Sequence, residues 1–136
     1  MTNSTKRPIL IVDDDPDDRE MIRDAFLENK YQQNYVFIED GEKLMDYLYN
    51  INHRRYPCLI LLDLNMPRKD GREALKEIKE NKEFNQIPTI ILSTSSSSSD
   101  RQISYELGAN CFVTKPDSYT KLVDITKSIG KLWFEN

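Results

Sequence analysis

Long apolar runs, a signal-peptide core and a dominant basic surface are all missing from this 136-residue sequence. No run approaches the roughly 20 apolar residues of a membrane span. The opening MTNSTKRP also lacks the apolar core of a secretion signal, so we expect a cytoplasmic protein that has no membrane partner. A formal net charge of −4 excludes a surface dominated by lysine and arginine, and we therefore expect no nucleic-acid partner.

Cysteine and histidine are scarce, with two of the first and one of the second. Cys58 and Cys111 stand beside apolar residues, which predicts two buried, reduced thiols. No spacing of Cys and His suits zinc. His53 lies in the polar stretch NINHRRYP, and without a second histidine we interpret it as a solvated loop residue. Thiol, zinc and histidine chemistry are therefore not the main candidates.

Short apolar runs alternate with stretches of helical spacing, and this pattern predicts the fold. The runs cover 8–12, 35–39, 57–63, 87–93 and 110–115. The helical stretches are marked by Met21, Ile22, Ala25, Phe26, Leu44, Leu48, Ile51, Leu75, Ile78, Ile103, Leu107, Leu122, Ile125, Ile129 and Leu132. Strands that alternate with helices predict an α/β protein with a parallel sheet. We expect one flavodoxin-like, doubly wound (βα)5 domain over 1–136, with strand order 2-1-3-4-5 and a short disordered N-terminus of about 1–6.

Local signals support the predicted helix ends. Pro16 suits the first turn of a helix, where its missing N–H costs nothing. Gly108 suits a helix C-terminus, and the serine run STSSSSSD suits a loop in which a late serine caps the next helix.

Carboxylates follow two of the predicted strands. Asp13 and Asp14 end the first apolar run, and Asp63 ends the third. Strands 1 and 3 are neighbours in the predicted order, so these side chains should converge and bind a divalent cation. Mg²⁺ fits best because it is a hard ion that prefers oxygen ligands.

The remaining aspartates of ILIVDDDPDD have a simpler explanation. An acidic surface patch would also account for them, because Asp15, Asp17 and Asp18 fall in or beside a first helical turn, where the helix dipole favours negative charge.

Two further strand ends add a hydroxyl and an ammonium to the predicted pocket. Ser93 ends the fourth run and Lys115 ends the fifth. A metal, a hydroxyl and an ammonium around a lone carboxylate are typical of a phosphoryl site. Asp63 is the expected nucleophile, because it stands apart from the Asp13–Asp14 pair.

Taken in order, these motifs resemble the receiver domain of two-component response regulators over nearly the whole chain. The match comprises the acidic pair, LLDLNMPRKDG around Asp63, Ser93 placed five residues after Pro88, and an aromatic, Phe112, three residues before Lys-Pro. The resemblance implies a phosphoryl group that passes from a histidine kinase to Asp63. It also implies Mg²⁺ held by Asp14, Asp63 and the main-chain carbonyl of Asn65, with Asp13 acting through water.

The same resemblance implies how a phosphate becomes a signal. Ser93 would be drawn toward the phosphoryl group and Phe112 would rotate inward, which alters the surface of the fourth helix, fifth strand and fifth helix. The bond between Lys115 and Pro116 would be cis. Ser93 replaces the commoner threonine, and Thr94 offers a second hydroxyl one residue later.

A narrower resemblance points to stand-alone regulators associated with phytochrome-type sensor kinases. It rests on LLDLNMPRKDGREAL, YELGANCFVTKP and SIGKLWF. One predicted helix accounts for the residues after the last strand, so we expect no output domain. We therefore expect the protein to signal by docking, by dimerising or by relaying phosphate. Leu132, Trp133 and Phe134 would either pack on their own sheet or form a homodimer seam.

Three alternatives remain open. A haloacid-dehalogenase-type phosphatase would use Asp13 and Asp15 as its D-x-D pair, but Asp17 stands where that pattern wants Thr or Val, and no late acidic ligands or capping insertion are visible. We therefore expect that the protein is not an enzyme and that it promotes only its own phosphorylation and dephosphorylation. A flavin-binding module would need a phosphate-cradling loop, which DDDPDD does not supply. The third alternative is an unphosphorylated docking module with a receiver fold.

Overall fold

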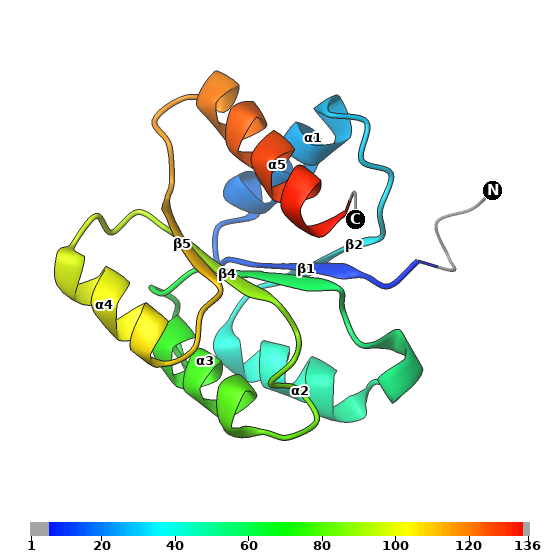
Figure 1. The fold of residues 1–136 in the computed structure, drawn as a ribbon, viewed down its shortest axis with the longest axis vertical. Coiled ribbons are helices and arrows are strands. Elements are labelled where there is room, and N and C mark those ends of the chain that lie inside the picture. The colour runs from blue at the N-terminus through cyan, green and yellow to red at the C-terminus, as the bar shows by residue number, and fades with distance from the viewer. Residues whose placement is uncertain (1–5, 135–136) are drawn as a thin grey trace.

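A parallel sheet of five strands forms the centre of the molecule, in the order β2-β1-β3-β4-β5 (Figure 1). The computed structural model describes residues 6–134, so the disordered N-terminus expected over about 1–6 lies outside the described residues except for Lys6, whose ammonium donates to the Gln32 carbonyl at 2.7 Å. The strands are β1 (Ile9–Val12), β2 (Tyr35–Ile38), β3 (Leu59–Leu62), β4 (Thr89–Ser93) and β5 (Cys111–Thr114). The predicted fold class and strand order are confirmed.

Helices cover both faces of the sheet, as a doubly wound fold requires. They are α1 (Pro16–Glu28), α2 (Gly41–Asn50), α3 (Gly71–Glu80), α4 (Ser98–Glu106) and α5 (Tyr119–Trp133), with a short 3-10 helix, η2 (His53–Arg55), before β3. Figure 1 shows α1 and α5 on one face and α2, α3 and α4 on the other. No helix within residues 6–134 has the length and apolar character needed to cross a membrane.

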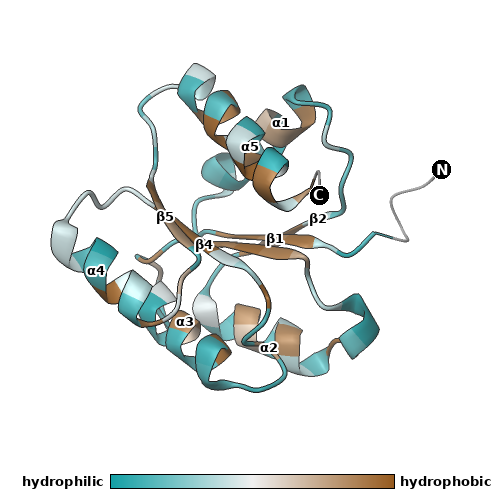
Figure 2. Ribbon diagram, in the orientation of Figure 1, coloured by the Kyte–Doolittle hydropathy of each residue, from teal (hydrophilic) through white to brown (hydrophobic). Residues whose placement is uncertain are grey.

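Alternation along β1 shows how one strand serves two cores. Ile9 and Ile11 pack with α1 and α5, whereas Leu10 and Val12 pack with α2 and α3. Figure 2 shows the apolar sheet between helices whose outer faces are hydrophilic. All residues of β1 and β3 are buried, but the edge strands β2 and β5 are mostly half-buried. Only the three central strands are therefore fully buried, because an edge strand has one uncovered side.

The predicted helix ends are confirmed in detail. Pro16 is the first residue of α1, and the Asp15 carboxylate before it accepts a hydrogen bond from the Asp17 amide at 2.9 Å. The Ser97 hydroxyl caps α4, and Gly108 follows that helix with φ of +106°, a conformation that favours glycine.

Three apolar residues do not lie where helical spacing predicts. Met21, Ile103 and Leu132 keep 43%, 39% and 62% of their surface exposed. Near Leu132, by contrast, Phe134 does pack against another helix, because its ring centre lies 5.7 Å from that of Phe26 in α1.

The scarce residue types have ordinary surroundings. Cys58 and Cys111 are free thiols that are half-buried, rather than fully buried as predicted. His53 is exposed and lies in η2, so the expectation of a solvated residue is correct although the stretch is helical.

Candidate functional site

The carboxyl ends of β1 and β3 bring the three predicted carboxylates together. The Asp63 amide donates to the Val12 carbonyl at 3.0 Å and the Asp13 amide donates to Ile38 at 3.0 Å, so both aspartates continue the strand ladder. Ligand oxygens of Asp13, Asp14 and Asp63 all lie within 4.8 Å of one another. Asp13 and Asp63 are buried, and Asp14 is exposed. The site thus has two buried carboxylates at its floor and one exposed carboxylate at its rim.

Lys115 reaches this cluster from the end of β5. Its Nζ lies 2.6 Å from Asp13 Oδ2 and 3.7 Å from Asp63 Oδ2. Its third partner, Asp18 Oδ2 at 2.9 Å, was not predicted, because sequence reasoning assigned Asp18 only to the helix dipole. The first turn of α1 instead turns this carboxylate toward the site, where it helps to hold the ammonium.

Burial controls the charge states of these groups. Burial raises the pKa of Asp63, and the nearby Lys115 opposes that rise. Burial also raises the pKa of Asp13, against the hydrogen bond from Lys115. Burial acts to lower the pKa of Lys115, but the hydrogen bonds that its ammonium donates to Asp13 and Asp18 outweigh burial and raise the lysine pKa. The carboxylates are therefore costly to ionise, and Lys115 stays charged.

The donor set fits Mg²⁺. Three carboxylates on neighbouring strand ends offer only hard oxygen ligands, and the exposed side of the site leaves room for the waters that Mg²⁺ keeps. Asn65 lies beside them, and its amide donates to Asp63 Oδ1 at 3.3 Å. Its carbonyl as a further ligand remains a prediction.

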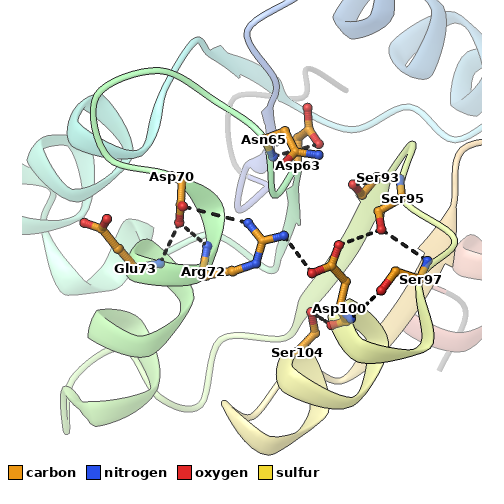
Figure 3. Close-up of polar contacts among 10 residues, drawn as sticks. All are labelled: Asp63, Asn65, Asp70, Arg72, Glu73, Ser93, Ser95, Ser97, Asp100 and Ser104. Carbon is orange, nitrogen blue, oxygen red and sulfur yellow. Dashed lines mark hydrogen bonds and ion pairs between the residues drawn. The ribbon is translucent and has the colours of Figure 1, made fainter.

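Ser93 is the last residue of β4, at the predicted strand end, and Thr94 lies beyond the strand. Ser93 is buried and pairs with Thr114 in the β4–β5 register, whereas Thr94 is exposed. The Ser93 Oγ accepts a hydrogen bond from the Ser95 amide at 3.3 Å. Figure 3 shows Ser93 on β4, with Asp63 and Asn65 on the neighbouring loop after β3.

The peptide bond between Lys115 and Pro116 is trans, which corrects the expectation of a cis bond. Trans is the preferred state even before proline, by about 0.5–1 kcal/mol. The Lys115 amide donates to the Ser93 carbonyl at 2.7 Å, and its side chain reaches Asp13, so both contacts form with the trans bond.

Phe112 is buried, with 3% of its surface exposed, and so already occupies an inward position. The Arg101 guanidinium lies 4.8 Å from the centre of its ring, and the Phe112 amide donates to the Tyr105 hydroxyl at 3.0 Å. Two side chains of α4 therefore contact the residue that is expected to act as a switch.

Gly71, the first residue of α3, supports the site by close approach. A Cβ at this position would collide with the main-chain oxygen of Asp63 and approach Leu64 Cα to 2.7 Å. We expect Gly71→Ala to destabilise the fold by about 1–3 kcal/mol, since backbone must shift to admit one methyl group. Chemical denaturation would measure this loss, with Ala74→Gly in the same helix as a comparison. Unchanged stability would show that the loop after β3 yields freely.

The buried carboxylate of Asp63 leads to a second prediction, on the stability of the fold. Because the folded pKa of Asp63 is raised, its ionised form costs stability at neutral pH. Asp63→Asn should therefore stabilise the metal-free protein by about 1 kcal/mol at pH 7. The gain should shrink as pH falls through the raised pKa and vanish below the unfolded value of about 3.9. Thermal unfolding against pH tests this, with the exposed Asp24→Asn as control; a destabilised Asp63→Asn would contradict it.

The strand order and the acidic cluster at its switch point define a flavodoxin-like α/β protein with three carboxylates at one edge that could hold a metal ion. Residues 9–127 match the response regulator receiver domain, and the chain belongs to this family.

Known relatives agree with this assignment over most of their length. The chain is 35% identical over 130 residues to response regulator Rcp1 of Synechocystis sp., covering 93% of this chain and 88% of that protein. The crystal structure of the phosphorylated cyanobacterial phytochrome response regulator RcpA is 37% identical, with a TM-score of 0.86 and 94% of each chain covered. The Mn²⁺-bound form of Rcp1 is 34% identical, with a TM-score of 0.85 and 96% of each chain covered. The phosphatase and flavin alternatives find no support in these similarities.

Proposed function

We propose that this protein is a stand-alone response regulator that accepts a phosphoryl group from a histidine kinase onto Asp63. The observation that carries the proposal is the position of the Asp63 carboxylate, 3.7 Å from the Lys115 ammonium and beside Asp13 and Asp14. Fixed charges of both signs around one carboxylate are suited to phosphoryl transfer.

The chain's own residues would divide the work. An Asp63 carboxylate oxygen attacks phosphorus, the phosphorus–oxygen bond forms, and the bond to the kinase histidine nitrogen breaks. Lys115 holds positive charge beside the phosphoryl oxygens, and Ser93 donates a hydrogen bond to one of them. Mg²⁺ would be held directly by Asp14, Asp63 and the Asn65 carbonyl and through water by Asp13, and it would supply further positive charge when bound. The protein thereby promotes only its own phosphorylation and dephosphorylation.

The cognate kinase in this proposal is of the phytochrome type. Support comes from RcpA, which is described as a cyanobacterial phytochrome response regulator, and from the similarity to Rcp1 over nearly the whole chain. Transfer from such a kinase would occur in the cytoplasm and would need neither nucleic acid nor a membrane.

Phosphotransfer from a phytochrome-type histidine kinase tests the proposal directly. We expect label to move to the wild-type chain when Mg²⁺ is present and to stay on the kinase when Mg²⁺ is chelated. A set of such kinases, none of which transfers label, together with no labelling by a small phosphodonor, would refute the proposed function and favour the unphosphorylated docking module.

The output surface in this proposal consists of α4, β5 and α5. Phe112 lies beneath it, held by Arg101 and Tyr105 of α4. Adding a phosphoryl group brings up to about two negative charges and new acceptor oxygens, which would draw Ser93 and shift the balance between two arrangements of this surface.

We expect Phe112→Ala to uncouple phosphorylation from partner binding. The variant should still take label on Asp63, but the difference in partner affinity between its phosphorylated and unphosphorylated forms should fall to about twofold or less. A binding assay against the kinase or a downstream partner measures this coupling. Coupling equal to that of the wild type would remove Phe112 from the switch.

The same surface could hold a second copy of the chain. Ile103 and Tyr105 on α4 and Leu132 on α5 expose apolar area that a homodimer would cover. Light scattering that shows a monomer with and without a phosphoryl mimic would exclude this dimer.

A further inference from the structure

Polar side chains, rather than apolar packing, attach α4 to the rest of the molecule. Ser104 is the one buried residue among those of α4, and Ile103 is 39% exposed. A helix with so little apolar contact gains most of its fixed position from specific polar partners. Figure 3 shows where those partners lie, in a line between α3 and the loop that joins β4 to α4.

Asp100 is the centre of this line. Its Oδ1 accepts a hydrogen bond from Arg72 Nη2 of α3 at 2.8 Å, and its Oδ2 accepts one from the Ser95 hydroxyl at 2.6 Å. Both carboxylate oxygens are therefore engaged, one by each neighbouring element. Arg72 and Asp100 are 29% and 21% exposed, so water competes for this ion pair less than at an open surface. We call Arg72, Asp100 and Ser95 the α3–α4 latch.

The backbone around Asp100 is held as well. Its amide donates to the Ser97 hydroxyl at 3.1 Å, and its carbonyl accepts from the Ser104 hydroxyl at 2.8 Å. The carboxylate therefore has little freedom to follow Ser95 if the loop moves. A displacement of the loop must break the contact between Ser95 and Asp100 or pull on Arg72.

The latch leads to the proposed phosphoryl site through Ser95. The Ser95 amide donates to Ser93 Oγ at 3.3 Å, while the Ser95 hydroxyl is bound to Asp100. The Ser95 carbonyl also accepts from the Thr114 hydroxyl at 3.3 Å. Ser93 is thus tied by its own oxygen to a residue that two further contacts, with Asp100 and Thr114, hold in place.

We propose that the α3–α4 latch holds Ser93 back from Asp63 and thereby slows the acquisition of a phosphoryl group. This inference rests on the proposed function, in which Ser93 must donate to a phosphoryl oxygen on Asp63. The Ser93 hydroxyl can donate to that oxygen while it still accepts from the Ser95 amide, but a shift of Ser93 toward Asp63 must either carry the Ser95 amide with it or break that bond, and the latched loop resists both movements. Arg72 and Asp100 are therefore positioning residues that act through Ser95 and Ser93.

The test is the rate of labelling by a small phosphodonor such as acetyl phosphate, with Mg²⁺ present. Arg72→Gln and Asp100→Asn should each raise the rate about three- to tenfold over the wild type. The double variant should label no faster than the faster single variant, because both changes open one latch. Ser95→Ala removes the hydroxyl that donates to Asp100 and so separates the loop from the ion pair of Arg72 and Asp100, while the ion pair and the Ser95 amide stay in place. It should therefore act in the same direction.

Matched controls separate the latch from general effects of charge. Arg23→Gln and Asp24→Asn make the same changes at an exposed pair on α1 and should leave the labelling rate unaltered. Hydrogen exchange in the absence of phosphodonor gives a second readout: exchange of the Ser95 and Ser97 amides should rise about tenfold in the latch variants and not in the controls.

The possible outcomes distinguish the two proposals. A wild-type chain that never takes label refutes the proposed function, and the latch's role in phosphorylation falls with it. A wild-type chain that takes label, with latch variants that label at the same rate or more slowly, overturns the latch alone. Unchanged hydrogen exchange at Ser95 and Ser97 would also overturn it.

Discussion

Asp63→Asn is expected to abolish phosphoryl labelling, whether the donor is a histidine kinase or a small phosphodonor. The amide is nearly isosteric but cannot supply the nucleophilic oxygen, so the labelling rate should fall by at least about a thousandfold. The fold should persist, because the buried charge that is removed is costly to the folded state. Radiolabel or mass added to the purified chain gives the measurement.

Asp13→Asn is the informative companion to that variant. A phosphatase of the haloacid-dehalogenase type would form its phosphoryl intermediate on Asp13 and would survive the change at Asp63. We expect the reverse, because Asp13 accepts a hydrogen bond from Lys115 at 2.6 Å and so serves as a support. Label retained by Asp63→Asn and lost by Asp13→Asn would contradict the proposed function.

We expect the second large effect from Asp14→Asn, which should lower the affinity for Mg²⁺. Asp14 is the exposed member of the cluster, so the change removes one ligand oxygen with little disturbance of the core. We expect Mg²⁺ affinity to fall at least about tenfold, with a matching fall in labelling at limiting Mg²⁺. Calorimetric titration with Mg²⁺ measures the first effect and phosphodonor kinetics the second.

Asp15→Asn is the matched control for Asp14→Asn. It removes the same charge from the neighbouring position, but the Asp15 side chain caps α1 and lies outside the cluster of three carboxylates. Its Mg²⁺ affinity should stay within about twofold of the wild type, since asparagine is also a good N-cap. Equal affinity in Asp14→Asn and the wild type would remove Asp14 from the metal site.

The fold could be predicted from the sequence because its central strands carry a local signal. Ile9–Val12 and Leu59–Leu62 are continuous apolar runs, and only a strand covered on both faces buries every residue of such a run. The cluster of Asp13, Asp14 and Asp63 followed from the topology, because neighbouring parallel strands end at the same edge. These carboxylates were therefore placed without knowledge of any side-chain position.

Features that depend on the third dimension were missed. Asp18 binds Lys115 from 97 positions away, and Arg72 binds Asp100 from 28 positions away. Neither sequence separation matches a helical or strand period, so no sequence pattern could have revealed these contacts. The exposure of Ile103 has the same origin, because α4 lies against β5 through polar contacts that helical spacing does not predict. The trans bond before Pro116 corrects an expectation that came from family resemblance alone.

A crystal structure of the wild-type protein with Mg²⁺ tests the central claim most directly. We predict one ion in near-octahedral coordination at about 2.1 Å from oxygens of Asp14 and Asp63, with the Asn65 carbonyl as a further ligand. One Asp63 oxygen should remain open toward Lys115. An ion bound elsewhere, or coordination that occupies both Asp63 oxygens, would contradict the account.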